Sequence, residues 1–189
     1  MKYTSISSFL IILFISVSFA AGVGHSETAM NDKEAYAGSQ LYSDQTHPQE
    51  FCLAQNIYYE SRTDNLAGQA AVADVVLNRV NDRRYPATIC EVVKEGPISK
   101  WWKEEKGKEV PIRDRCQFSW YCDGKPDDQP EGDKWRQAQE LAYKMIHQNY
   151  LRGISEGATH YHATYVNPAW NRDMHLIGRI GLHIFYVSR

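Results

Sequence analysis

A segment that is apolar around nearly its whole circumference constrains the fold most. Residues 66–81 follow a helical pattern whose apolar members include Ala70, Ala71, Val72, Val75, Val76 and Val80. A helix that is apolar on all sides belongs in the interior of a domain. The sequence therefore predicts a central buried helix here, with Asp64 or Asn65 as its N-cap.

A second helix is predicted just before it, from about Gln49 to Arg62. Leu53 and Ile57 share one face of this helix, and Glu60 falls on or beside that face near the helix end. The negative end of the helix dipole and partial burial both favour a protonated carboxyl group at this position. A neutral carboxylic acid is the proton donor that glycosidic bond cleavage requires. The alternative is a solvated Glu60 paired with Arg62, as is usual for carboxylates on helices.

Two further helices and a short sheet complete the predicted domain. The capping box from Thr88 to Glu91 predicts a short helix that ends near Gly96. Asp133 is the predicted N-cap of a helix that runs to about Leu151. The segments 158–166 and 179–187 read as strands, so we expect a small C-terminal antiparallel β-hairpin. The expected fold class is α+β and mainly helical.

A long irregular insertion, residues 98–132, is expected between the last two helices. Loops of this length in a compact domain are often functional. Within it, Gln117, Phe118 and Ser119 lie in a short segment that Cys116 and Cys122 could close. Sugar rings stack on aromatic side chains, and Gln and Ser can bond to sugar hydroxyls and amides. The alternative is a minor packing cluster beneath a loop.

The N-terminus has the pattern of an export signal. A basic start is followed by an apolar run over residues 9–19 and a small-x-small site at Ser18-Phe19-Ala20. We expect a signal peptide over residues 1–20, a flexible polar leader over 21–48 and a catalytic domain over 49–189. The apolar run is short for a membrane span, and an uncleaved anchor is the alternative. The residue directly after the cleavage site is Ala21 and not a cysteine, so no lipoprotein anchor is expected, and no stable membrane anchor after cleavage.

Four cysteines remain after cleavage, namely Cys52, Cys90, Cys116 and Cys122. An even count in an exported chain indicates two disulfides, for which three pairings are possible. We favour Cys52 with Cys90 and Cys116 with Cys122. A zinc site fits poorly, because the second pair lacks the C-x₂-C spacing. A secreted or periplasmic location follows from the export signal.

Charge and motifs exclude several classes of function. The formal net charge of −2 and the lack of a long basic run give nucleic-acid binding no electrostatic support. Neither a free thiol nor a G-x-S-x-G elbow is present for a nucleophilic hydrolase. His160 and His162, followed by His175 and His183, could bind zinc as in metal-dependent amidases, although no acidic residue joins them at ligand spacing.

A second carboxylate is harder to assign from the sequence. Asp64 lies four residues after Glu60, and the two would face one way only if the helix continued. Because Asn65 favours a helix boundary, a mechanism with two carboxylates is not secured.

Several ordered blocks of the sequence resemble one known family. They are Leu53-Ala54 with Tyr59-Glu60-Ser61-Arg62, Gly68 to Ala73, Val76 to Val80, Gln117 to Ser119, Gly157 to Tyr161 and Ile177 to Phe185. Together they resemble the cell-wall hydrolases related to the spore cortex-lytic enzymes SleB and CwlJ. Thr63 stands where relatives often have Gly. The insertion with Trp101 and Trp102 and the four cysteines are not typical of the spore enzymes, so substrate preference is not carried over.

The resemblance implies a lysozyme-like, lytic-transglycosylase-like fold that acts on peptidoglycan glycan strands. It implies that Glu60 is the catalytic acid and that Asp64 stands where many members carry a second acid. Tyr59, Gln117, Phe118, Ser119 and Tyr161 are the expected groove residues. We expect a monomeric enzyme without a cofactor that cleaves the bond between N-acetylmuramic acid and N-acetylglucosamine. The alternatives are an N-acetylmuramoyl-L-alanine amidase, which could be zinc-dependent, and a non-catalytic peptidoglycan-binding module.

Overall fold

The computed structural model describes residues 42–127 and 130–188. The expected signal peptide and most of the expected leader lie outside these residues. Within the described ranges, no helix combines the length and the apolar character needed to cross a bilayer. Tyr42 is buried, its ring stacks on that of Tyr143 at 5.8 Å, and its carbonyl accepts a hydrogen bond from Gln139. The folded part therefore begins earlier than the predicted start at Gln49.

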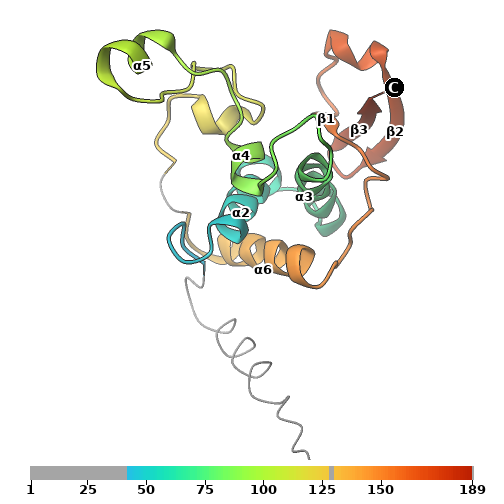
Figure 1. The fold of residues 1–189 in the computed structure, drawn as a ribbon. Coiled ribbons are helices and arrows are strands. Elements are labelled where there is room, and N and C mark those ends of the chain that lie inside the picture. The colour runs from blue at the N-terminus through green and yellow to red at the C-terminus, as the bar shows by residue number, and fades with distance from the viewer. Residues whose placement is uncertain (1–41, 128–129, 189) are drawn as a thin grey trace, which may run out of the picture.

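Three helices form the body of the domain (Figure 1). They are α2 (Pro48–Ser61), α3 (Leu66–Val80) and α6 (Asp133–His147). The α6 helix packs mainly on α2, and the short α4 (Ile89–Val93) packs on both α2 and α3. Residues 70–76 are all buried, which confirms the prediction of a central α3.

The helix ends follow local side-chain chemistry. Asn65 is the N-cap of α3 and accepts a hydrogen bond of 2.9 Å from Gly68 N. Thr88 is the N-cap of α4, as predicted, and its Oγ1 accepts a hydrogen bond of 3.3 Å from Glu91 N. The N-cap of α6 is Gly132 rather than Asp133, and α6 ends at His147, before the predicted end near Leu151. Gly132 has φ of 81°, a conformation that favours glycine, so the chain turns one residue earlier than predicted.

The predicted α+β class is confirmed, but the C-terminal sheet has three strands rather than two. They are β1 (His160–Ala163), β2 (Met174–Ile180) and β3 (His183–Ser188), arranged antiparallel in the order β1-β3-β2. The predicted strand over 179–187 contains the β2–β3 turn at Gly181 and Leu182. Gly181 has φ of 58°, which reverses the chain although the apolar alternation continues across it.

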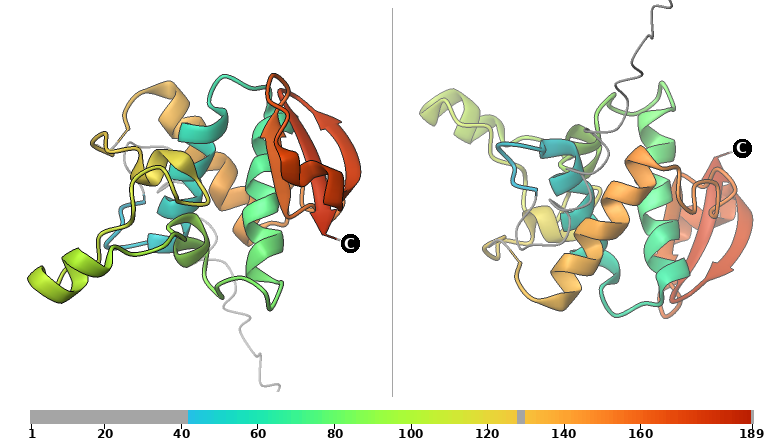
Figure 2. Two further views of the ribbon diagram at one scale, coloured as in Figure 1. Left: turned by 90° about the horizontal axis from the view of Figure 1, so that it is seen from above. Right: turned by 90° about the horizontal axis from the view of Figure 1, so that it is seen from below.

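The insertion is more ordered than predicted. It contains α5 (Lys100–Lys106) and the 3₁₀ helix η1 (Ser119–Cys122). Two views show α5 projecting from the body on the side opposite the sheet, with residues 110–127 between them (Figures 1 and 2). The favoured cysteine pairing is confirmed, since Cys52 is bonded to Cys90 and Cys116 to Cys122. The first bond joins α2 to α4, and the second closes the loop that leads into η1.

Candidate active site

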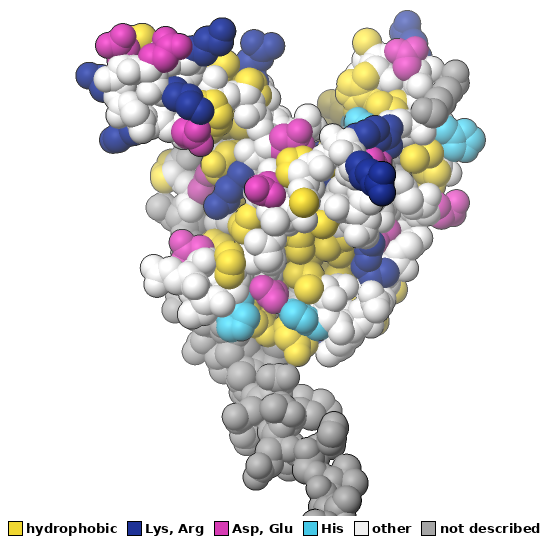
Figure 3. Space-filling view, viewed as in Figure 1, with side chains coloured by type: hydrophobic (Ala, Val, Ile, Leu, Met, Phe, Trp, Pro, Cys, Tyr) yellow, Lys and Arg dark blue, Asp and Glu magenta, His cyan; other side chains and the backbone are white. Residues whose placement is uncertain are grey.

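A groove of about 450 Å³ lies where α2 ends, between η1 and the sheet. Its walls include Glu60 from α2, Arg79 from α3, Gln117 just before η1, Ser119 at the start of η1, and Tyr161 from β1. The molecular surface is hollowed between the lobe that carries α5 and the lobe that carries the sheet (Figure 3). The groove thus brings together residues that are about 100 positions apart in the sequence.

Glu60 is the penultimate residue of α2 and is partly buried in the groove wall. Its Oε2 accepts a hydrogen bond of 3.1 Å from the hydroxyl of Tyr161. Burial raises the pKa of Glu60, while the Tyr161 hydrogen bond and the positive charge of Arg79 lower it by smaller amounts. The side chain is therefore held closer to neutrality than an exposed glutamate, and it can act as a proton donor.

Tyr161 is well suited to hold this carboxyl group. Its ring packs against the rings of His183 and Phe185, with centroid distances of 5.1 and 5.7 Å. Burial and the neighbouring Glu60 raise the pKa of Tyr161 well above its ordinary value. The phenol accordingly stays protonated and always has a proton to donate toward Glu60.

Arg79 is a groove residue that the sequence analysis did not single out. It is only 5% exposed, and its Nε donates to Thr159 O over 2.8 Å. Its guanidinium lies 5.2 Å from the ring centroid of Tyr85 and 5.3 Å from that of Phe118. Within the described residues its Nη1 has no hydrogen-bond partner. A buried arginine with a spare donor beside a carboxyl group is suited to stabilise negative charge that forms there.

The predicted sugar-binding residues all line the groove, but they differ in what they expose. Gln117 and Ser119 are exposed and can reach a ligand. Tyr59 is partly buried, and its ring stacks on Trp120 at 4.6 Å. Phe118 also lines the groove but is only 3% exposed, so little of its ring is available to stack on a sugar. Its ring instead packs against the guanidinium group of Arg79.

Asp64 does not line the groove, which argues against its predicted role as a second acid. The carboxylate is buried under the β2–β3 turn, where it accepts hydrogen bonds from Asn65 N at 2.7 Å and Leu182 N at 2.8 Å. A Cβ atom added at Gly68 or Gly181 would come within 2.2 or 2.3 Å of it. Asp64 therefore fastens the sheet to the loop between α2 and α3.

Three of the four predicted histidines, His160, His162 and His183, line the groove, but within the described residues they form no metal site. His162 bonds to Ala163 O at 2.9 Å and to the hydroxyl of Tyr186 at 3.0 Å. His183 Nδ1 lies 3.3 Å from Asp64 Oδ2 but outside hydrogen-bond geometry. His175 is exposed on β2 and does not line the groove. Over residues 42–127 and 130–188, no three His, Cys, Asp or Glu side chains are grouped to hold a metal ion.

A buried carboxylate that the sequence analysis overlooked positions β1. Asp74 on α3 is fully buried and pairs with Arg152, and it accepts hydrogen bonds from Gly153 N at 3.1 Å and Ser155 Oγ at 2.6 Å. Asn78 donates to Ala158 O at 2.9 Å. An acidic residue in the middle of an otherwise apolar helix was the available signal. These bonds hold the turn that leads into β1, and so they set the position of Tyr161.

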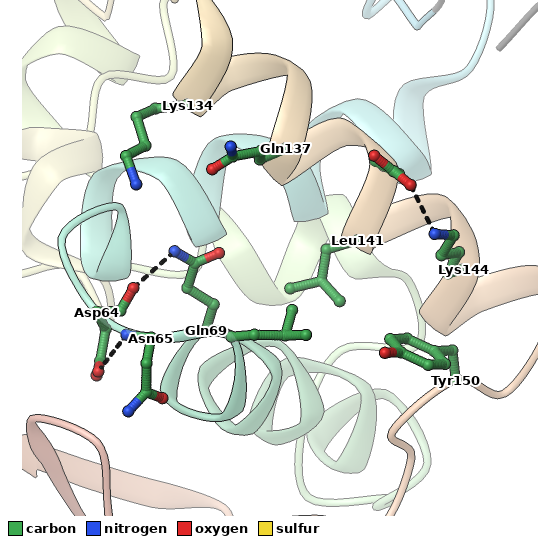
Figure 4. A pocket seen from close by; sticks show the side chains of 10 residues that line it. Asp64, Asn65, Gln69, Lys134, Gln137, Leu141, Lys144 and Tyr150 are labelled. Atoms are coloured by element: carbon green, nitrogen blue, oxygen red, sulfur yellow. Dashed lines mark hydrogen bonds and ion pairs between the residues drawn. The ribbon is translucent and has the colours of Figure 1, made fainter. Parts of the chain in front are cut away.

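A second pocket of about 450 Å³ lies between α3 and α6 and shares no lining residue with the groove (Figure 4). Gln69 and Gln137 extend into it from the two helices. Its charged pair, Lys144 and Glu140, is neutralised by a contact of 2.6 Å. The other acid that lines the pocket, Asp64, has its carboxylate engaged by Asn65 N and Leu182 N, so the groove with Glu60 is the better candidate for an active site.

Comparison with known proteins gives one family match. A family model described as Cell Wall Hydrolase matches residues 63–186, a segment that begins just after Glu60 and includes Arg79 and Tyr161. No curated protein matches the chain.

Two solved structures are similar to this chain. One is the catalytic domain of the germination-specific lytic transglycosylase SleB from Bacillus anthracis, at 24% identity, 77% coverage of this chain, 97% of that chain and a TM-score of 0.49. The other is the catalytic domain of the Bacillus cereus SleB protein, at 22% identity, 80% and 99% coverage and a TM-score of 0.47.

Proposed function

The chain belongs to the Cell Wall Hydrolase family, and from this membership we propose that it cleaves peptidoglycan at the β-1,4 bond between N-acetylmuramic acid and N-acetylglucosamine. The observation that carries the proposal is Glu60, a partly buried acid with a raised pKa at the wall of a groove large enough for sugar rings. Family membership indicates the substrate class, and the acid in the groove indicates that the bond cleaved is a glycosidic one.

Glu60 acts first as a general acid. In its protonated form it donates a proton to the glycosidic oxygen, and the bond from that oxygen to C1 of the muramyl residue breaks. The carboxylate that forms is stabilised by the Tyr161 hydroxyl and by the charge of Arg79. The N-acetyl oxygen of the substrate can stabilise the positive charge that develops at C1.

The same carboxylate then acts as a base. It takes the proton from the C6 hydroxyl of the muramyl residue while that oxygen attacks C1, which gives a 1,6-anhydro sugar and restores neutral Glu60. This lytic transglycosylase route needs one carboxylate. Two observations support this route over one with two carboxylates. Asp64 is hydrogen-bonded to Leu182 N beneath the sheet, and Glu60 is the only acid among the described residues that line the groove.

The proposed setting is the cell envelope outside the cytoplasm. Two disulfides support an oxidising compartment. We propose export through the signal peptide at residues 1–20, a secreted or periplasmic location and action as a monomer, since one chain supplies every residue of the groove.

Mass spectrometry of digested, purified sacculi tests the proposed function. We expect muropeptides with anhydro ends from the wild-type protein and none from Glu60→Gln. Reducing ends would make the protein a hydrolase that uses water, and free stem peptides would make it an amidase. No release by the wild type, with sacculus binding that is unchanged in Glu60→Gln, would make it a binding module.

A further inference from the structure

The α5 helix exposes two tryptophans that core packing does not explain. None of its seven residues is buried. Trp101 is 56% and Trp102 39% exposed, and their rings meet edge to face at 4.9 Å. Adjacent exposed indoles on a helix that buries nothing indicate a binding surface, because scattered apolar side chains are usual on a protein surface and large aromatic patches are not.

The α5 helix and the segments on either side of it (residues 98–111) form a hairpin-like projection, which we call the tryptophan arm. Ile98 and Pro111 form a bridge between the two sides of the arm, and Ser99 N donates to Val110 O over 2.9 Å. At the base, Ile112 N donates to Pro97 O over 2.8 Å. These bonds hold α5 in a defined position relative to the body.

The arm is continuous with the groove. The chain passes from it through the Cys116–Cys122 loop directly to Gln117 and Ser119, which line the groove. Gln117 N is fixed by a bond of 2.9 Å to Glu95 O, just before the arm begins. The arm forms one side of the hollow whose opposite side is the sheet (Figures 1 and 3). A polymer that lies in the groove and continues past Gln117 meets the arm.

We propose that the tryptophan arm is an additional binding surface for peptidoglycan glycan strands, distinct from the residues that surround the cleaved bond. The inference rests on the proposed function for the identity of the polymer. Indole rings stack on the apolar faces of sugars, as aromatic side chains do in ligand sites. Lys100 on α5 is exposed and suits the carboxylates of the stem peptides.

The charge of the arm favours this ligand over a lipid surface. Residues 100–109 contain four lysines and three glutamates. Recruitment to an anionic membrane depends on a clear excess of basic residues, which is not found here. A mixed set of charges beside aromatic rings is suited to a strand of sugars with charged peptide branches.

The test compares ligands of two lengths and uses the inactivating change Glu60→Gln as the background, so that strands stay intact. Trp101→Ala and Trp102→Ala are added together, and Tyr150→Ala serves as control because Tyr150 is 41% exposed and lines the other pocket. We expect the double change to weaken binding to long glycan strands about tenfold, as for loss of two stacking rings. Binding of a two-sugar muropeptide, which is confined to the groove, and the thermal midpoint stay the same.

Several results would overturn the inference. One is that the double change leaves the affinity for long strands unchanged. Another is that it weakens binding of the two-sugar fragment as much as binding of long strands. A third is that it weakens binding only to vesicles that contain anionic lipid. These measurements do not depend on catalysis. A wild-type protein that releases nothing from sacculi would therefore defeat the proposed function and leave the binding comparison to decide the role of the arm.

Discussion

The hydroxyl of Tyr161 donates a hydrogen bond of 3.1 Å to Glu60 Oε2, and so it joins the first strand of the sheet to the end of α2. Burial and hydrogen bonding act on Glu60 in opposite directions. Burial raises its pKa, while the Tyr161 hydroxyl and Arg79 lower it. The balance gives a carboxyl group that can both lose a proton and regain one.

Tyr161→Phe should raise the pKa of Glu60 further, because the carboxylate loses a donor while the burial remains. The alkaline limb of the pH–rate profile for muropeptide release should move to higher pH. The value of kcat/KM at the optimum should fall about tenfold or more, as for a hydrogen bond to a charged group. A limb that moves to lower pH would contradict this account of the pair.

Arg79→Met should also move the alkaline limb to higher pH, since the positive charge lowers the pKa of Glu60. Arg79→Lys keeps that charge and should leave the limb nearly in place. Both changes remove the bond to Thr159 O, and the free energy of unfolding should fall by about 1–3 kcal/mol in each. If the two variants share one pH profile, the charge of Arg79 has no part in the protonation of Glu60.

Glu60→Gln should stabilise the protein at high pH. As pH rises from the ordinary pKa of 4.5 toward the raised folded value, the unfolded chain releases its proton first, so the wild type loses stability through that window. Glutamine carries no charge and avoids this loss, by about 1.4 kcal/mol for each unit by which the pKa is raised. Denaturant unfolding of both proteins across pH 4 to 8 measures it. A constant difference between them would refute a raised pKa.

Asp64→Asn should lower the free energy of unfolding but have only a small effect on the catalytic rate. The amide can replace only part of the acceptor set that holds Asn65 N and Leu182 N. We expect a loss of about 1–3 kcal/mol in unfolding free energy. The kcat at a temperature where the variant is folded should stay within about tenfold of wild type, in contrast to the 10²–10⁴-fold effect of a lost catalytic acid. A loss of that larger size would support Asp64 as a second acid.

Local patterns were sufficient to predict α2, α3, α4 and α6, but not α5 and not all of the sheet. The apolar circumference of α3 and the capping box at Thr88 are properties of neighbouring residues, and both predictions are confirmed. The β2–β3 turn was missed because apolar alternation continues through Gly181. The α5 helix was missed because it buries no face, so it has no apolar stripe to reveal it.

The same distinction applies to the site. Glu60 could be proposed from its place at a helix end next to apolar residues. Arg79 could not, because a charged residue on a helix is usually solvated and its burial depends on Thr159, 80 positions away. Asp74 had a signal in its place within an apolar helix, but its partner Ser155 lies 81 positions away. The burial of Phe118 could not be predicted for a similar reason. Sequence shows that an aromatic ring is present but not which side of the loop it faces.

The contact of Asp64 with Gly68 and Gly181 has a consequence for how this protein can vary. A single methyl group at either glycine would displace the carboxylate that fastens the sheet, and the displaced sheet would carry the Tyr161 hydroxyl away from its acceptor. Substitutions at two positions outside the groove lining can thus abolish activity. Lineages that retain catalysis should keep both unsubstituted, or change all three positions together.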